Sequence, residues 1–242
     1  MKTSTKSPIV ILHGWGRELS GGKYDAIKQL LGKKGYTVYT PDFPGFGASQ
    51  LGKTSFEFED YVSFVNEFIT KNKLKKVVLL GHSFGGRVAI RFATEFADKV
   101  DLLILTGASG IPRPLSSLKK KIVFVTVKIL RPLFLISPIS FFFRFFRKLV
   151  YYSIDEMDYY KAGNLSKTFK NVYQVSILPD LPKIKVRTLL VWGEEDKTIP
   201  LIDAKEMELL IPRAKLVVVK NEGHRLPYEN PQKFMQAIES FL

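Results

Sequence analysis

The chain has 242 residues, a formal net charge of +14 and no cysteine. A chain of this length suits one large domain, or one core domain that carries an insertion. The lack of cysteine excludes a disulfide framework, a thiol nucleophile, a zinc site built on cysteine and an iron–sulfur cluster. With three histidines in the whole chain, a metal site rich in histidine is not expected either.

Short apolar segments alternate with longer segments of helical periodicity in the first part of the chain. The predicted elements are, in order, strand 9–12, helix 24–33, strand 36–40, helix 56–71, strand 77–80, helix 84–96 and strand 100–105. The alternation returns near the C-terminus with strand 187–192, helix 201–210, strand 216–219 and helix 232–242. This pattern predicts an α/β fold, with a mostly parallel sheet and helices on both of its faces.

Between residues 111 and 185 the alternation stops, and the chain is rich in Phe and Tyr. We interpret 111–185 as a mostly helical cap, inserted into a core made of residues 1–110 and 186–242. Between Ile111 and Tyr151, nine side chains are Lys or Arg and none is Asp or Glu. Two readings of this basic segment stay open: contact with an anionic membrane surface, or an ordinary solvated face. No nucleic-acid recognition motif accompanies it, so a nucleic acid partner is not expected.

The N-terminus does not resemble an export signal. Residues 1–7 are polar, and the apolar run 8–12 ends at once in His13-Gly14. The longest uncharged stretch, 132–143, contains two prolines and is shorter than the roughly 20 residues that a membrane-spanning helix needs. We therefore expect a cytoplasmic protein without a transmembrane anchor.

A Gly-x-Ser-x-Gly motif lies between the predicted strand 77–80 and the predicted helix 84–96. It comprises Gly81, Ser83 and Gly85. A turn that presents a serine in this way is so sharp that the residues two before and two after it must lack a bulky side chain. The motif and its strand–turn–helix setting together predict that Ser83 is a nucleophile.

A serine hydroxyl is a weak nucleophile unless a base takes its proton and a third group orients that base. Among the histidines, only His224 follows Ser83 in the chain. It lies just beyond the predicted strand 216–219, at the carboxyl end of the sheet, where open α/β proteins assemble their sites. His224 is therefore the predicted base, and His82 is interpreted as a packing or supporting residue.

The orienting acid should lie between the serine and the histidine and should leave another strand at the same edge. The loop after strand 187–192 offers Glu194, Glu195 and Asp196. We choose Asp196, and the two glutamates stay as alternatives. Acyl transfer also needs backbone N–H groups aimed at the developing oxyanion. The expected donors are Phe84, directly after the nucleophile, and Trp15, in the loop after the first strand.

Five motifs in this order resemble those of the α/β-hydrolase superfamily over nearly the whole chain. They are His13-Gly14-Trp15-Gly16, the Gly/Pro loop 42–49, the motif around Ser83, the Asp196 loop and His224. The resemblance implies an eight-stranded sheet, a cap after the sixth strand, a Ser-Asp-His triad in that order and no cofactor. Only eight residues precede the first predicted strand, so the family's two leading antiparallel strands are expected to be reduced or absent.

Within this superfamily, Ser83 argues against relatives that open epoxides or displace halide, because those use an aspartate nucleophile. Relatives that cleave carbon–carbon bonds of ring-fission products usually carry Asn where this chain has His82. That difference disfavours a carbon–carbon hydrolase without excluding it. A lactonase, a thioesterase and a non-enzymatic ligand receptor are further alternatives. The expected function is a serine esterase that cleaves small to medium carboxylic esters through an acyl-enzyme. The sequence leaves the oligomeric state open.

Overall fold

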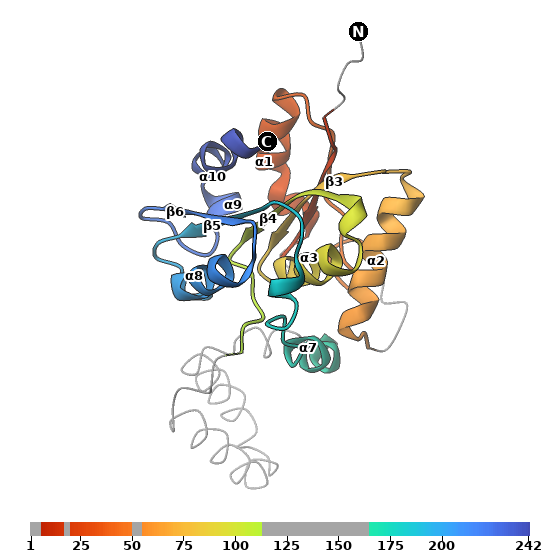
Figure 1. Cartoon of the computed structure of the whole chain (residues 1–242). Coiled ribbons are helices and arrows are strands. Elements are labelled where there is room, and N and C mark those ends of the chain that lie inside the picture. Colours follow the sequence, from red (N-terminus) through yellow and green to blue (C-terminus); the bar gives the residue numbers. More distant parts are fainter. Residues whose placement is uncertain (1–5, 17–19, 50–54, 113–164) are drawn as a thin grey trace, which may run out of the picture.

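A six-stranded parallel sheet forms the centre of the computed structural model, which describes residues 6–16, 20–49, 55–112 and 165–242 (Figure 1). The strands, from one edge to the other, are β2 (Val38–Tyr39), β1 (Ile9–Leu12), β3 (Val77–His82), β4 (Val100–Thr106), β5 (Thr188–Gly193) and β6 (Ala214–Val219). All neighbouring strands are parallel. Among the described residues, no antiparallel strand precedes β1. The predicted parallel sheet is confirmed.

Alternate residues of each strand pack on opposite faces of the sheet. Ile9 and Ile11 of β1 belong to one hydrophobic cluster, whereas Val10 and Leu12 belong to the other. Val10 lies opposite Leu79 of β3 in the ladder, so each cluster continues from strand to strand. Because both faces are buried, the strands read as continuous apolar runs. This burial is the reason that the sequence pattern located them.

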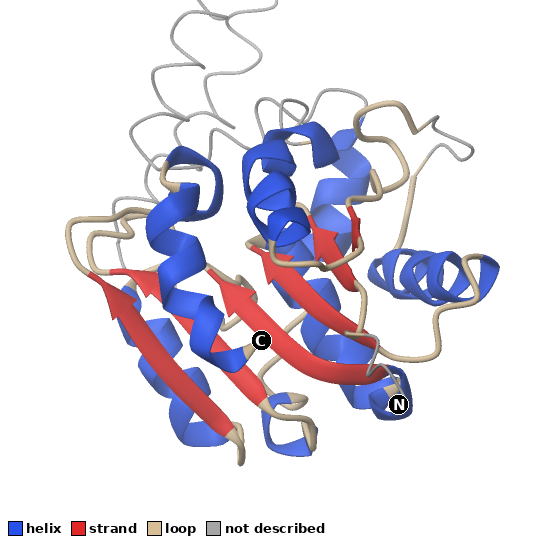
Figure 2. Ribbon diagram, turned by 90° about the horizontal axis from the view of Figure 1, so that it is seen from above, coloured by secondary structure: helices blue, strands red, loops and turns tan. Residues whose placement is uncertain are grey.

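Helices cover both faces of the sheet (Figure 2). One cluster includes buried residues of α2 (Phe58–Lys71), α3 (Phe84–Glu95) and α8 (Leu201–Leu210). The other includes residues of α1 (Asp25–Lys33), α9 (Leu226–Glu229) and α10 (Pro231–Ile238). Short 3₁₀ segments occupy Gly21–Tyr24, Ala97–Lys99, Leu181–Lys183 and Glu239–Phe241. The layers bury apolar side chains on each side of the sheet and leave its strand ends for loops.

The largest differences from the predicted boundaries occur in the edge strand β2 and in the last helix. The expected strand 36–40 is paired only at Val38 and Tyr39, which form an edge of the sheet. The expected last helix, 232–242, ends at Ile238 and tightens into a 3₁₀ turn. Helix α9 was not predicted, because four residues that include Pro227 are too few to show a helical period.

The predicted cap is described only in part, because residues 113–164 lie outside the described ranges. Helix α7 (Ser166–Tyr173) packs on the core at two points. The Phe56 amide donates to Thr168 Oγ1 at 3.1 Å, and Arg87 Nη1 donates to the Val172 carbonyl at 2.6 Å. The cap boundaries and the membrane contact of its basic segment stay predictions. In the described part of the chain, no helix combines the length and the apolar character needed to cross a membrane.

Candidate active site

Ser83 occupies the sharp turn between β3 and α3. Its φ of +53° lies in the left-handed region, which a non-glycine residue adopts rarely and at an energetic cost. The turn also requires close backbone contacts. A Cβ atom at Gly81 would lie 2.6 Å from the Gly86 Cα atom, and one at Gly85 would lie 2.2 Å from the Leu12 carbonyl oxygen. These contacts explain why small residues flank the serine.

Asp196 and His224 meet at the carboxyl ends of β5 and β6. His224 Nδ1 lies 2.8 Å from Asp196 Oδ2. The second carboxylate oxygen, Oδ1, accepts hydrogen bonds from the amides of Thr198 and Ile199 at 2.9 and 2.8 Å. The Asp196 side chain is 1% exposed. Both carboxylate oxygens are thus held by donors, which fixes the carboxylate against the imidazole.

The other carboxylates considered for this role lie elsewhere. Glu194 and Glu195 are exposed to solvent. Of the three carboxylates in the loop after β5, Asp196 is the one that binds His224.

The end of β4 lies between the serine turn and the imidazole. The Ser83 amide donates to the Thr106 carbonyl at 3.0 Å, and the Ser109 amide donates to the Ser83 carbonyl at 3.2 Å. Gly107, between them, packs so closely on His224 that a Cβ atom there would lie 2.7 Å from Nδ1. Among the described residues, the structure shows no hydrogen bond between the Ser83 hydroxyl and His224, a contact that is often long in enzymes without substrate.

The loop after β1 packs against the N-terminus of α3. The Trp15 and Phe84 rings are both buried and meet edge to face, with centroids 5.3 Å apart. His13 fixes the start of this loop. It accepts a hydrogen bond from the Phe43 amide on Nε2 at 3.0 Å, so its Nδ1–H donates to the Gly14 carbonyl at 2.8 Å. Burial lowers the pKa of His13. Phe84 is the first residue of α3, and an amide at this position has no hydrogen-bond acceptor within its own helix.

Comparison with known proteins decides the family. The sequence pattern of the alpha/beta hydrolase family matches residues 9–237. The chain belongs to the alpha/beta hydrolase family. This match spans the described sheet and the residues assembled at its carboxyl edge.

Several known proteins are similar to the chain over most of its length. An esterase from Exiguobacterium antarcticum shares 26% identity and a TM-score of 0.74, with 98% of this chain and 92% of the esterase covered. A 2-hydroxy-6-oxononadienedioate/2-hydroxy-6-oxononatrienedioate hydrolase of Escherichia coli is 25% identical, with 97% of this chain and 86% of the relative covered. A bromoperoxidase from Bacillus anthracis, 22% identical with a TM-score of 0.73 over 98% of this chain and 92% of its own, shares the fold. The similarities to the esterase and to the Escherichia coli hydrolase support hydrolase activity.

Two residues of this alpha/beta hydrolase site were missed by the sequence analysis. Gly107 supports the imidazole, and the hydroxyl of Tyr24 lies 2.7 Å from His82 Nδ1. The Nε2 atom of His82 in turn lies 2.9 Å from the His224 carbonyl oxygen. His82 is therefore a supporting residue as well as a packed one. No local motif marks either Gly107 or Tyr24, because each contact joins distant parts of the chain.

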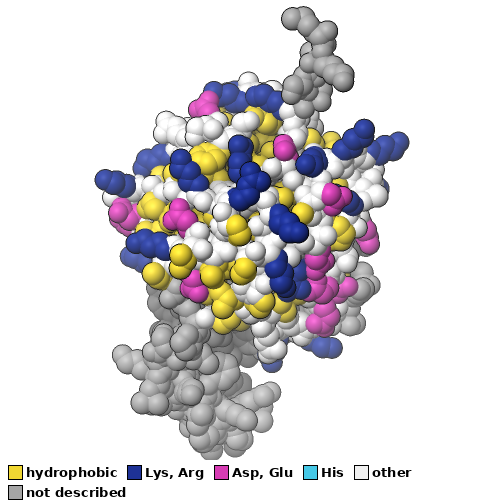
Figure 3. Space-filling model, viewed as in Figure 1, with side chains coloured by type: hydrophobic (Ala, Val, Ile, Leu, Met, Phe, Trp, Pro, Cys, Tyr) yellow, Lys and Arg dark blue, Asp and Glu magenta, His cyan; other side chains and the backbone are white. Residues whose placement is uncertain are grey.

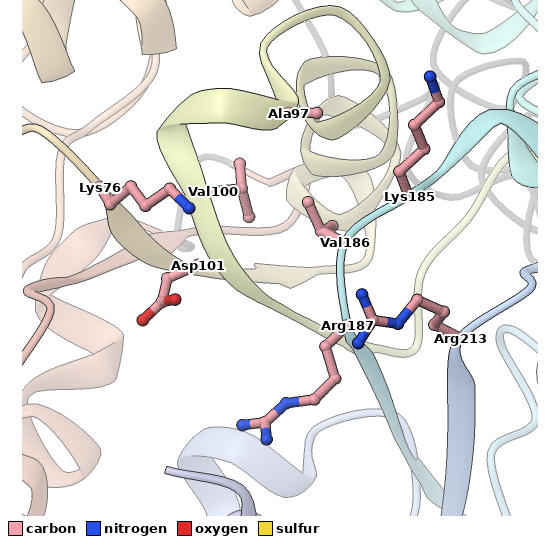
Figure 4. Close-up of a pocket in the computed structure, with 8 residues that line it drawn as sticks. All are labelled: Lys76, Ala97, Val100, Asp101, Lys185, Val186, Arg187 and Arg213. Atoms are coloured by element: carbon pink, nitrogen blue, oxygen red, sulfur yellow. The ribbon is translucent and has the colours of Figure 1, made fainter.

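A cavity of about 410 Å³ lies on the side of the sheet where the strands begin, opposite the candidate active site (Figure 4). It is lined near the amino ends of the strands by Lys76, Asp101, Arg187 and Arg213, among others. In Figure 3, Lys and Arg side chains are scattered over the described part of the viewed face, interspersed with Asp and Glu. Because Ser83 emerges at the carboxyl ends, this cavity is separate from the candidate active site. In the described ranges, no group of three or more His, Asp or Glu side chains could hold a metal ion.

Proposed function

We propose that this alpha/beta hydrolase cleaves carboxylic esters through a covalent acyl-enzyme. Ser83 is the nucleophile, His224 the base and Asp196 the group that orients the base. The observation that carries the proposal is the pair of the buried Asp196 and the partly buried His224, hydrogen-bonded at 2.8 Å and packed on the strand end that also binds the backbone of Ser83.

Each step of the reaction has a group assigned to it. The Ser83 oxygen attacks the ester carbonyl while its proton moves to His224 Nε2. The backbone N–H groups of Trp15 and Phe84 stabilise the oxyanion, and a single donor of this kind is worth roughly 10² to 10³ in kcat. His224 returns the proton to the leaving alcohol as the C–O bond breaks. Water then attacks the acyl-enzyme in the same way and releases the acid and free Ser83.

An aromatic cluster near the proposed oxyanion donors supports a small to medium acyl group. The Trp15 ring meets Phe46, Phe84 and Phe169 edge to face, with centroids 4.9, 5.3 and 5.1 Å apart. Apolar walls of this kind favour a longer acyl chain by up to about 0.8 kcal/mol, or about fourfold in kcat/KM, for each buried CH₂. We expect kcat/KM to rise from acetyl to butyryl or hexanoyl esters and then to level off. A flat or falling series beyond acetyl would argue against an acyl pocket.

The second candidate is hydrolysis of a carbon–carbon bond. It is favoured by the similarity to the Escherichia coli ring-fission hydrolase, and it uses the same protein fold. The presence of His82, where such enzymes usually carry Asn, favours the esterase. Lactones and thioesters need the same attack on a carbonyl, so they belong in the same substrate panel.

The test compares wild-type protein with Ser83→Ala on p-nitrophenyl esters, a lactone, a thioester, an amide and a ring-fission dienoate. We expect ester turnover that is fastest among these substrates and is lost in Ser83→Ala. A fluorophosphonate should label Ser83 and no other serine, because its tetrahedral adduct resembles the transition state. Faster turnover of the dienoate would favour the second candidate. Absence of turnover and of labelling would favour a ligand receptor.

A further inference from the structure

We propose that Tyr24 and His82 are positioning residues that hold the nucleophile, the base and the oxyanion loop in register. The inference rests on the roles proposed above for Ser83, His224 and Trp15. It starts from two hydrogen bonds in a row. The Tyr24 hydroxyl lies 2.7 Å from His82 Nδ1, and His82 Nε2 lies 2.9 Å from the His224 carbonyl oxygen. The Gly14 amide faces the Tyr24 oxygen and interacts with it electrostatically.

These contacts join three parts of the site that are far apart in the sequence. Gly14 directly precedes Trp15 in the loop of the proposed oxyanion donor. His82 directly precedes Ser83, so its side chain ties the backbone of the nucleophile to the backbone of the base. A shift of the His224 loop would break the bond from His82, and a shift of the oxyanion loop would disturb Tyr24.

Only one arrangement of protons satisfies every partner. The His224 carbonyl accepts only, so His82 Nε2 must carry a proton. With a neutral ring, Nδ1 of His82 is then an acceptor, and the Tyr24 hydroxyl must donate to it. Tyr24 therefore selects the tautomer of His82 that can bind the His224 loop.

The surroundings keep this arrangement in place. Tyr24 and His82 are both completely buried, and the rings of His224 and Tyr228 pack on His82 with centroids 4.8 and 5.8 Å away. Burial lowers the pKa of His82 well below its usual value and raises that of Tyr24, so both stay neutral. A donor or acceptor that lost its partner here would be poorly compensated by water.

The test changes the hydrogen bonds and leaves the rings. Tyr24→Phe removes the hydroxyl that selects the tautomer. We expect kcat on the best ester to fall between about tenfold and a hundredfold, as for a small displacement of reacting groups, with KM within about twofold because no substrate contact is removed. His82→Leu should lose at least as much kcat. His82→Gln should recover part of the loss, because an amide offers one acceptor and one donor.

Tyr36→Phe is the matched control. The Tyr36 hydroxyl also belongs to a buried tyrosine and donates to a backbone carbonyl, that of Leu242, at 2.7 Å. This bond lies at the C-terminus of the chain, away from the active site. The variant should lose stability by a similar amount and keep its kcat. Equal losses of kcat in Tyr24→Phe and Tyr36→Phe would show that general destabilisation explains the loss, and would overturn the inference.

A spectroscopic measurement tests the bond directions without activity. In protein labelled with ¹⁵N-histidine, His82 should be a neutral ring protonated on Nε2 at neutral pH, and Tyr24→Phe should change its nitrogen shifts. A ring protonated on Nδ1 alone would overturn the inference. Turnover that depends on Ser83, with kcat unchanged in Tyr24→Phe, would overturn the inference alone. A wild-type protein that turns over no ester would overturn the proposed function, and the nitrogen shifts would then decide the hydrogen-bond arrangement.

Discussion

Gly107→Ala adds a single methyl group and should nevertheless have a large effect on catalysis. A Cβ atom added there would lie 2.7 Å from His224 Nδ1 and 2.8 Å from Cε1. Non-bonded atoms of this kind prefer a separation of about 3.5 Å, so the imidazole must move by about 0.8 Å in Gly107→Ala. A misplacement near 1 Å costs roughly 10²-fold. We expect kcat/KM on the best ester to fall by about that factor.

The same substitution also strains the backbone. The φ of Gly107 is +51°, in the left-handed region, where an alanine costs about 1 to 2 kcal/mol of stability. Gly35→Ala separates this cost from the clash. Gly35 has a φ of +85°, and no described atom lies within 4 Å of a Cβ atom built on it. Gly35→Ala should therefore be destabilised with its kcat/KM unchanged.

The assay measures kcat/KM well below the unfolding temperature and the free energy of unfolding by chemical denaturation. If both variants lose stability and neither loses kcat/KM, then Gly107 does not set the position of His224. A fall in kcat/KM in both variants would show that destabilisation alone is sufficient. Either result would refute the reasoning from the close contact.

Three further predictions concern the proposed triad and the buried histidines. Asp196→Asn should lower kcat by about 10⁴, because the amide favours the wrong tautomer of His224; an unaltered kcat would exclude this role. Ser83→Ala and His224→Ala should each lower ester turnover by several orders of magnitude, and the double variant should be hardly worse than either, which steady-state kinetics can check. His13 and His82 have lowered pKa values in the folded chain, so below about pH 6.5 the unfolded chain binds more protons. These two groups should lower the free energy of unfolding by up to about 2.7 kcal/mol per pH unit as the pH falls, and should contribute little slope above about pH 7.5; denaturation between pH 5 and 8 tests this.

The features that sequence analysis predicted are those with local causes. The central strands β1, β3, β4 and β5 are buried on both faces and are therefore mostly apolar, and α3 follows Ser83 at once. The motif around Ser83 is local because Gly81 and Gly85 make the turn sterically possible. Asp196 could be expected near His224 because parallel strands bring their carboxyl ends to one edge.

The features that were missed depend on contacts between distant segments. Tyr24 and His82 are 58 residues apart, and nothing around Tyr24 indicates its partner. Gly107 is one of 17 glycines, and only the position of the His224 ring distinguishes it from the others. The preference for Asp196 over its two glutamate neighbours was stated from the sequence, but its physical reasons, burial and the bonds to Thr198 and Ile199, are not visible in the loop sequence.

The close approaches that build this site join parts of the core to one another. Gly81 and Gly85 bring β3, α3 and the end of β1 together, and Gly107 brings β4 under His224. None of these contacts requires a particular acyl or alcohol group, so a core of this kind can keep its catalytic geometry while the residues around the substrate change. This separation is consistent with an esterase and a 2-hydroxy-6-oxononadienedioate/2-hydroxy-6-oxononatrienedioate hydrolase both being similar to this chain. Substrate preference should therefore be tested with variants of the aromatic cluster around Trp15, which is proposed to contact the acyl group, with Trp15 and Phe169 first. Changes to the proposed triad would abolish turnover of every ester alike.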